Sequence, residues 1–267
     1  MSDSKTQQDY ENYRRWAQDL AGEAGEITLR YFRKGIEVRQ KADQSPVTQA
    51  DTETEQLLRE RIEERFPEHG LIGEEFGSSF KGQEQPEYTW IVDPIDGTKS
   101  FVHGVPLYTV LIALLHRGEP VVGIIHNPVT GETASAAAEN GAWLNGTPAR
   151  VSDTEHLEDA WLQITDYVDF LRRQRSFAME VMERAAAGRT WADGYGYLLV
   201  ATGRSDCMID PIMQPWDIAA VKPVITEAGG VFSDFEGNTR GVGRSAIAGT
   251  PSVHRELLEL LGVSSGA

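Results

Sequence analysis

Three short acidic segments hold the residues of this chain that are best suited to chemistry. They occupy residues 73–75, 93–98 and 215–217. In the second segment, a predicted strand leads into Asp93, a proline stiffens the backbone after it, and Asp96 follows three residues later. A turn of this kind can point both carboxylates at one place, and Gly97 lets the backbone come close to a ligand there.

A cation is the group that such an arrangement requires. A helix that begins near Thr98 would direct unpaired N–H groups and the positive end of its dipole at the same place, which favours a bound anion. Carboxylates beside a bound anion repel it unless a cation lies between them. Because the three segments offer oxygen ligands and contain no histidine or cysteine, they favour Mg²⁺ over Zn²⁺.

Each acidic segment also has a purely structural explanation. Asp93 and Asp96 can serve as turn and helix N-cap residues, and Asp217 can cap the helix that follows it. Glu74 and Glu75 can form a solvated acidic pair. The sequence alone does not show that the three segments meet, so both explanations are open at this point.

The predicted helices and strands would position these segments. Apolar residues recur at helical spacing from about residue 10 to residue 32, and again after Thr48 and Asp51, which have the spacing of a capping box. An extended stretch through Val38 and a loop at 41–46 separate these two helices. Strands are predicted at residues 88–92 (before a turn at 93–97), 109–116, 121–126, 133–138 and 142–144, and further helices near 177–187 and 217–228.

The change of pattern after about residue 152 predicts an α/β chain, with α+β character, in two halves. Residues 1–151 are expected to form a helix-flanked antiparallel-sheet half with most of the candidate metal ligands. Residues 152–267 are expected to form a mixed α/β half that supplies Asp217. No flexible linker separates the two, so they should share one body.

Composition narrows the functional classes. Hydrophobic residues make up 40% of the 267 residues, and the formal net charge is −16. That charge argues against a nucleic acid or an anionic membrane as the main partner. The single cysteine, Cys207, excludes an internal disulfide and suits a reducing cytoplasm. No apolar run is long enough to span a membrane, and the first ten residues lack the apolar region of a signal peptide.

Two of the acidic segments resemble signatures of the inositol monophosphatase family. Residues 91–101, Ile-Val-Asp-Pro-Ile-Asp-Gly-Thr-Lys-Ser-Phe, are similar to the first signature. Residues 215–220, Pro-Trp-Asp-Ile-Ala-Ala, followed by Glu-Ala-Gly-Gly at 227–230, are similar to the second. Residues 41–51 and 73–75 match two further family segments in the right order. The resemblance covers nearly the whole chain, and within the family it is greatest to the histidinol-phosphatase branch.

The resemblance implies a set of metal ligands. Glu74, Asp93 and the carbonyl oxygen of Ile95 would hold one Mg²⁺ ion, and Asp93, Asp96 and Asp217 would hold a second. Glu74 would also help to hold a third, weaker ion. Metal ions roughly 3.5–4 Å apart can activate water and stabilise both ends of an in-line displacement at phosphorus.

The resemblance also implies roles around the metals. Thr98 and Asp51 would position and activate the attacking water, and the N–H groups of Gly97 and Thr98 would hold the phosphate. Asp193 and Asp210 fall at substrate-facing positions of the family. Two carboxylates there favour a cationic alcohol such as histidinol, because an unpaired buried charge is costly and charge-assisted hydrogen bonds would satisfy both. The structural alternative is that Asp193 caps a turn and Asp210 is a loop residue.

The resemblance therefore implies a Mg²⁺-dependent phosphomonoesterase that hydrolyses L-histidinol phosphate to L-histidinol and phosphate. Inositol 1-phosphate is the alternative substrate, and fructose 1,6-bisphosphate and nucleotide 3′-phosphates are more remote ones. A metal-dependent binding or regulatory protein without turnover is the non-enzyme alternative. The family further implies a layered α/β/α/β/α sandwich, a cytoplasmic homodimer, a small phosphate ester as the bound partner, and sensitivity to lithium.

Overall fold

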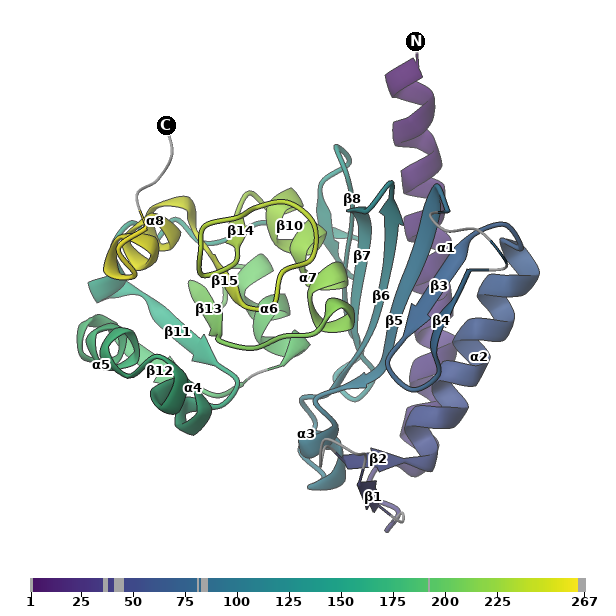
Figure 1. Cartoon of the computed structure of the whole chain (residues 1–267), viewed down its shortest axis with the longest axis horizontal. Helices are drawn as coiled ribbons and strands as arrows, with labels where there is room; N and C mark the ends of the chain where they lie inside the picture. The colour runs from purple at the N-terminus through teal and green to yellow at the C-terminus, as the bar shows by residue number, and fades with distance from the viewer. Residues whose placement is uncertain are drawn as a thin grey trace.

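Helices and sheets alternate in layers, as Figure 1 shows. The protein is seen in a computed structural model that describes residues 2–35, 38–40, 46–80, 82, 86–191 and 193–263. The three helix layers are α1 (Ser2–Tyr31) with α2 (Gln49–Arg65), α6 (Gly194–Ala201) with α7 (Pro215–Glu227), and α4 (Tyr167–Arg173) with α5 (Arg175–Arg184) and α8 (Pro251–Leu260). One sheet lies between each two successive helix layers, so the predicted α/β/α/β/α sandwich is confirmed.

An eight-stranded sheet lies between the first two helix layers. Its strand order is β10 (Thr147–Ala149), β9 (Ala142–Leu144), β8 (Glu132–Ala137), β7 (Glu119–Asn127), β6 (Thr109–His116), β5 (Tyr88–Asp96), β3 (Gly70–Gly73) and β4 (Gly77–Ser79). Neighbouring strands are antiparallel except β3 and β5, which are parallel. β6 is a nearly continuous apolar run because helices cover both faces of the sheet.

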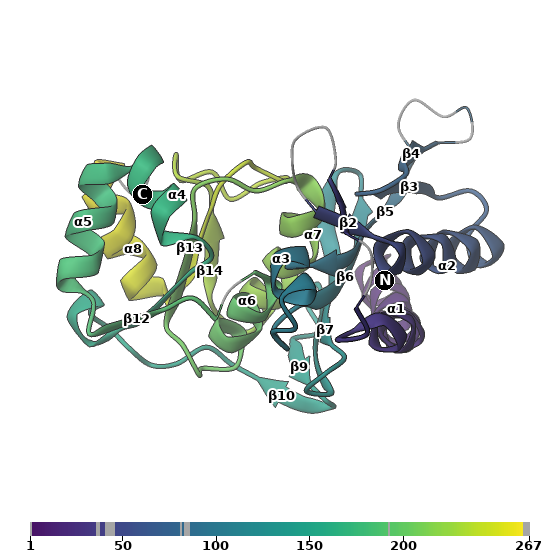
Figure 2. The same cartoon turned by 90° about the horizontal axis from the view of Figure 1, so that it is seen from below.

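A five-stranded mixed sheet lies between the central and the outer helix layer. Its order is β12 (Ala187–Arg189), β11 (Trp161–Ile164), β13 (Cys207–Asp210), β15 (Ala246–Gly249) and β14 (Val231–Ser233). β11 runs parallel to both of its neighbours, and the other pairs are antiparallel. Figure 2 shows α6 and α7 between these strands and the larger sheet.

The central helix α7 holds the two sheets together. Its residues from Ile218 to Ile225 are all buried, as expected for a helix that is packed on several sides. Gly123 of β7 permits close contact, since a Cβ atom there would lie 2.1 Å from the carbonyl oxygen of Ala220. One apolar cluster consequently joins Leu111 of the larger sheet to Met208 of the smaller one.

Short elements complete the described part of the chain. β1 (Val38–Gln40) and β2 (Pro46–Thr48) form an antiparallel ribbon, α3 (Thr98–Val102) follows β5, and a 3₁₀ turn spans Leu157–Asp159. Within the described residues, no helix has both the length and the apolar character needed to cross a membrane.

Most elements lie close to their predicted bounds. The capping box of Thr48 and Asp51 is confirmed, as is the hairpin of β6 and β7. α1 is longer than predicted, since it begins at Ser2. The helix predicted at 177–187 is partly wrong: α5 ends at Arg184, and the chain then enters the edge strand β12. The predicted loop at 41–46 falls almost entirely outside the described residues.

Candidate metal centre

Asp93 and Asp96 face the same side of the larger sheet because β5 contains a bulge. In a regular strand, residues three positions apart point to opposite faces. Asp93 pairs with Leu111 of β6 and Asp96 pairs with Thr109, so two residues of β5 lie opposite a single residue of β6. The extra residue returns Asp96 to the face of Asp93. Pro94 suits this place, since it has no N–H group to donate to the neighbouring strand.

The predicted turn at residues 93–97 is therefore wrong. β5 continues through Asp96, and the chain turns only at Gly97, whose φ of 84° lies in the left-handed region that favours glycine. Gly97 is also the N-cap of α3, which begins at Thr98 as predicted. Asp96 is accordingly a strand residue rather than an N-cap, and the N–H groups of Gly97 and Thr98 lie at the N-terminus of α3.

The same bulge arranges the polar groups of Ile95 and Thr98. The N–H group of Ile95 donates to Asp93 Oδ1 at 3.0 Å, which fixes one carboxylate oxygen. Thr98 Oγ1 donates to the carbonyl oxygen of Ile95 at 3.1 Å. A carbonyl oxygen has two lone pairs, so this contact leaves one of them for a further partner such as a metal ion.

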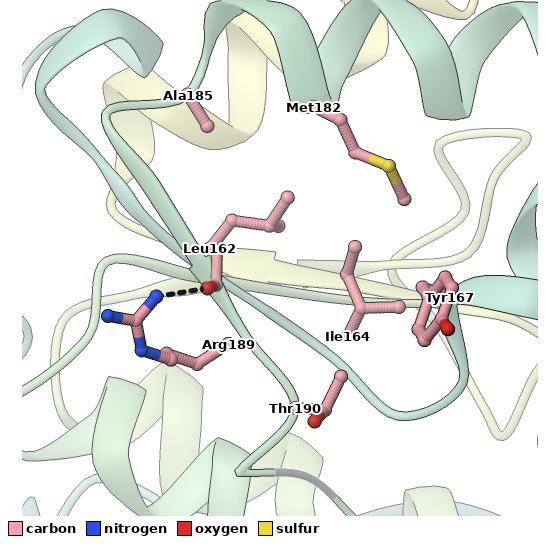
Figure 3. Close-up of a pocket in the computed structure, with 8 residues that line it drawn as sticks. Leu162, Ile164, Tyr167, Met182, Ala185, Arg189 and Thr190 are labelled. Atoms are coloured by element: carbon pink, nitrogen blue, oxygen red, sulfur yellow. Dashed lines mark hydrogen bonds between the residues drawn. The ribbon is translucent and has the colours of Figure 1, made fainter.

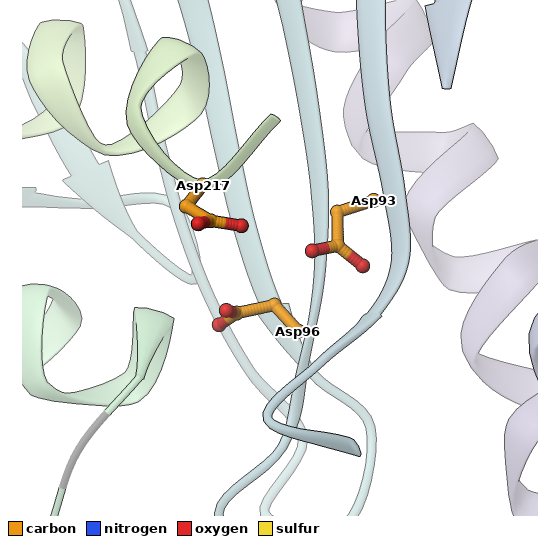
Figure 4. A group of neighbouring side chains, drawn as sticks. All are labelled: Asp93, Asp96 and Asp217. Carbon is orange, nitrogen blue, oxygen red and sulfur yellow. The ribbon is translucent and has the colours of Figure 1, made fainter. Parts of the chain in front are cut away.

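Asp217 approaches the other two aspartates from α7. It occupies the third position of the helix, where its carboxylate accepts the N–H group of Gln214 at 2.7 Å in a capping box. Gln214 is the N-cap, so the alternative of Asp217 as the N-cap is wrong. Figure 4 shows the carboxylates of Asp93, Asp96 and Asp217 directed toward one another. One oxygen from each lies within 4.8 Å of the others.

Negative charge is concentrated at this acidic cluster of Asp93, Asp96 and Asp217. Burial, followed by the charges of Glu74, Asp96 and Asp217, raises the pKa of Asp93 well above its usual value. Burial, followed by the charge of Asp96, does the same to the pKa of Asp217. Burial also raises the pKa of Asp96 to about 6, although two hydrogen bonds oppose this change.

The two groups that donate those hydrogen bonds were not identified from the sequence. The hydroxyl of Thr109 donates to Asp96 Oδ2 at 2.8 Å, and the backbone N–H of Gly194 donates to the same oxygen. A Cβ atom on Gly194 would lie 2.4 Å from Thr109 Oγ1 and 2.6 Å from Asp96 Oδ2, so glycine is needed there. The sequence signal that could have identified Gly194 was its place at the start of an apolar helix, where a glycine indicates close packing.

Glu74 and Asp51 border the acidic cluster on the side of α2. Glu74 follows β3 directly, and its charge contributes to the raised pKa of both Asp93 and Asp51. Asp51 is fully buried, and this burial is the main reason that its pKa is raised to about 6. Its Oδ2 accepts the N–H and the hydroxyl of Thr48, whereas its Oδ1 has no hydrogen-bond partner among the described residues. One oxygen thus caps the helix, and the other is available for a ligand.

Asp193 lies against the turn at Gly97. An oxygen of its carboxylate is 2.7 Å from the place that a Cβ atom on Gly97 would occupy. Its backbone, with φ 55° and ψ −153°, has a conformation that residues other than glycine rarely adopt. Burial, then the charges of Asp96, Asp210 and Asp217, raises the pKa of Asp193 well above its usual value. Asp193 is the N-cap residue of α6, but its side chain makes no capping hydrogen bond, so the carboxylate itself does not cap the helix.

Asp210 is more deeply enclosed than Asp193. It is the last residue of β13 and is buried, so the alternative of a loop residue is wrong. Its Oδ2 accepts the hydroxyl of Tyr197 at 2.8 Å, and hydrogen bonds from Thr165 also stabilise its charged form. Burial nevertheless raises its pKa above the usual value. The structure thus brings Asp210 into electrostatic contact with the acidic cluster while the protein itself satisfies part of its carboxylate.

The donor atoms at the acidic cluster fit a hard divalent cation. All of the side chains that meet there offer carboxylate oxygens, and each charge disfavours the others in a buried setting. The charge of Lys99 lowers the pKa of Asp193, but the Lys99 side chain is 79% exposed, and burial and three neighbouring carboxylates have larger effects in the opposite direction. A bound cation with a preference for oxygen ligands would offset this repulsion.

A separate apolar cavity lies in the smaller-sheet half, and Figure 3 shows residues that line it. Its volume is about 350 Å³. It is lined by Leu162, Ile164, Tyr167, Met182, Ala185, Gly188, Arg189 and Thr190. None of these lining residues is acidic, so the cavity does not contribute ligands to the acidic cluster.

Comparisons with known proteins agree with this geometry. A sequence model of the inositol monophosphatase family matches residues 9–263. The histidinol-phosphatase of Chlorobaculum parvum is 40% identical over 250 residues, which span 92% of this chain and 95% of that protein. The histidinol-phosphatase of Mycobacterium tuberculosis is 36% identical over 253 residues, spanning 91% and 95%. The structure of a Thermotoga maritima IMPase superposes with a TM-score of 0.85 at 29% identity, covering 94% of this chain and 97% of that one. The chain therefore belongs to the inositol monophosphatase family and is a metal-dependent phosphomonoesterase.

Proposed function

We propose that this enzyme uses Mg²⁺ to hydrolyse L-histidinol phosphate to L-histidinol and inorganic phosphate. The observation that carries the proposal is the carboxylate of Asp193, which lies against Gly97 beside the acidic cluster. The two histidinol-phosphatases, at 40% and 36% identity, support the same substrate. The family name and the likeness to the Thermotoga maritima IMPase make inositol 1-phosphate the alternative.

The acidic cluster supports the metal ligands that the family resemblance implies. Glu74, Asp93 and the carbonyl oxygen of Ile95 would hold one ion, and Asp93, Asp96 and Asp217 would hold a second. When bound, the cations supply positive charge to the phosphoryl group and to the leaving oxygen. This supply matters here because the protein carries a net charge of −16 and would otherwise repel a phosphate ester.

Asp51 and Thr98 are the residues that would hold the attacking water. Asp51 Oδ1 is a buried acceptor without a partner among the described residues, so it can accept one hydrogen of a water molecule. Thr98 Oγ1 gives its own hydrogen to the Ile95 carbonyl and can therefore accept the other. Both residues would orient the water, and the Asp51 carboxylate would receive the one proton that the water loses during attack. The N–H groups of Gly97 and Thr98 would hold a phosphate oxygen at the start of α3.

Asp193 and Asp210 would select the alcohol. Asp210 is buried and Asp193 is partly buried near other negative charges, and burial raises the pKa of both. A neutral polyol would leave that charge unpaired, which is costly. The amine of histidinol would instead form charge-assisted hydrogen bonds worth about 1.5–3 kcal/mol each. The strained backbone at Asp193 agrees with a functional role, because such conformations are concentrated at active sites.

The test compares kcat/KM for L-histidinol phosphate and inositol 1-phosphate. The wild-type protein should prefer histidinol phosphate, and both Asp193→Ala and Asp193→Asn should narrow the preference by about tenfold, the effect of one contact of about 1.4 kcal/mol. Asp193→Asn keeps the shape of the side chain and removes only its charge. Asp153→Ala is the matched control, since Asp153 is exposed. Its neighbour Thr154 donates to Asp206, which precedes the start of β13, whereas Asp210 lies at the other end of that strand. If the wild-type protein has an equal kcat/KM for the two esters, or a higher one for inositol 1-phosphate, the substrate assignment is refuted. The assignment as a phosphatase would not be affected.

The remaining family features stay predictions. A homodimer, a cytoplasmic location and sensitivity to lithium are proposed from the family alone. We likewise propose the division into residues 1–151 and 152–267, with Asp217 as the metal ligand from the second half.

A further inference from the structure

A buried carboxylate on α2 holds the turn that presents Glu74. Residues 74–76 form the tight connection between β3 and β4. Glu55, which is fully buried, accepts the backbone N–H of Glu75 at 2.6 Å through Oε2 and that of Phe76 at 3.1 Å through Oε1. Two successive N–H groups of the turn are therefore bound by one side chain, which fixes the direction in which the chain leaves β3.

The surroundings of Glu55 are built to keep it in this position. A Cβ atom on Gly73 would lie 2.1 Å from Glu55 Oε1, so the absence of a side chain at Gly73 makes room for the carboxylate. Arg59 Nε donates to the same Oε1 at 2.8 Å, and Arg59 also donates to the carbonyl of Gly77 at the far end of the turn. The charge of Glu55 is thus paired, as a buried carboxylate requires.

The position of Glu55 along α2 links the turn to the rest of the site. Asp51, Glu55 and Arg59 are spaced four residues apart, which places them on one face of the helix. Asp51 lies at the acidic end of this face, where the charge of Glu74 reaches it. One helix therefore carries both Asp51 and Glu55, the residue whose carboxylate binds the backbone next to Glu74.

We propose that Glu55 is a positioning residue that aims the Glu74 carboxylate at the metal centre through the backbone of residues 75 and 76. The inference rests on the proposed function, in which Glu74 is a metal ligand. Mg²⁺ tolerates little error in ligand geometry. Removing groups that orient a metal ligand typically lowers metal affinity by about 10- to 100-fold, and Glu55 stands in that relation to Glu74.

The experiment measures Mg²⁺ binding to the full-length protein by isothermal titration calorimetry. Glu55→Gln should weaken Mg²⁺ binding by about 10- to 100-fold, because one of its two acceptor oxygens becomes an NH₂ group that cannot accept a backbone N–H. Glu60→Gln is the matched control: the same substitution on the exposed face of the same helix should change affinity by no more than about twofold. The Mg²⁺ concentration for half-maximal phosphate release should shift with the affinity, while KM for the phosphate ester should not.

Two further variants make each outcome decisive. Gly73→Ala keeps the glutamate at position 55 but displaces its carboxylate, so it should weaken Mg²⁺ binding in the same way as Glu55→Gln. It provides the test if thermal unfolding without metal shows that Glu55→Gln folds poorly. Glu74→Gln reports on the ligand assignment itself. If Glu74→Gln weakens binding while folded Glu55→Gln and Gly73→Ala bind Mg²⁺ like the wild-type protein, the positioning role is overturned. If Glu74→Gln binds Mg²⁺ normally, Glu74 is not a metal ligand, and both the proposed ligand set and the positioning role of Glu55 are wrong.

Discussion

Replacing Asp93 by asparagine separates the electrostatic cost of the acidic cluster from its function. Asp93 is the aspartate proposed to bind both ions, and its neighbours' charges contribute to its raised pKa. The asparagine keeps a side-chain oxygen that can accept the N–H of Ile95, so the bulge in β5 should persist. The substitution removes one negative charge from a buried group of like charges and should therefore stabilise the metal-free protein while it abolishes turnover.

The size of the stabilisation can be worked from the geometry. Carboxylate oxygens of Asp93, Asp96 and Asp217 lie within 4.8 Å of one another. Two full charges at such a separation repel by about 3–4 kcal/mol in a medium with an effective dielectric constant of about 20. The measured gain should be smaller, about 2 kcal/mol, because Asp93 can bind a proton instead of remaining charged. For a chain of this size, that corresponds to a rise in Tm of about 4–8 °C.

The assay is thermal unfolding in EDTA at pH 8, paired with phosphate release in saturating Mg²⁺. Asp93→Asn should unfold at a higher temperature than the wild-type protein and lose at least about 1,000-fold in kcat/KM, equivalent to about 4 kcal/mol of transition-state stabilisation. Asp153→Asn, at an exposed position, serves as the control for both measurements. A lower Tm for the metal-free variant would refute the electrostatic reasoning, and near-normal phosphate release would refute the shared-ligand role.

Two further predictions concern the water site and the pH dependence of stability. Thr98→Ala should lower kcat by about 100-fold with little change in calorimetric Mg²⁺ affinity, because its hydroxyl is assigned to the water; the reverse pattern, with affinity lost and kcat kept, would contradict the role. The metal-free protein should lose stability as the pH rises from about 4 to about 6, because folded Asp51, with its pKa raised to about 6, still holds a proton that the unfolded chain has lost. The difference from the ordinary value of 3.8 corresponds to about 3 kcal/mol for this one group, and this contribution is lost once the pH has passed the folded pKa. Mg²⁺ should reverse the trend, and a Tm in EDTA that rises across this range would exclude the raised pKa.

The acidic cluster could be predicted because its residues are close together in sequence or belong to a recognisable segment. Residues 93–98 predicted two carboxylates that point at one place and a helix start, and the structure has both. The bulge could not be predicted, since a proline between two aspartates is equally compatible with a turn and with an irregular strand. Only the pairing with β6 decides between them, and that pairing depends on the whole sheet.

The residues that support the site were missed for a related reason. Glu55, Thr109 and Gly194 are ordinary residues of a helix, a strand and the start of a helix when considered alone. Their importance comes from contacts with Glu75 and Asp96, which are distant in sequence. Local sequence patterns do not contain information about such contacts, so the residues that orient a ligand can be identified only from the folded structure.

The most direct test of the metal centre is anomalous X-ray diffraction from crystals of this protein soaked with Mn²⁺ and phosphate. Mn²⁺ accepts the same oxygen ligands as Mg²⁺ and gives an anomalous signal. We predict two strong peaks that share Asp93, one also bound by Glu74 and the other by Asp96 and Asp217, with phosphate at the N-terminus of α3. Peaks at other residues, or an acidic cluster without bound metal at saturating Mn²⁺, would contradict this account of the active site.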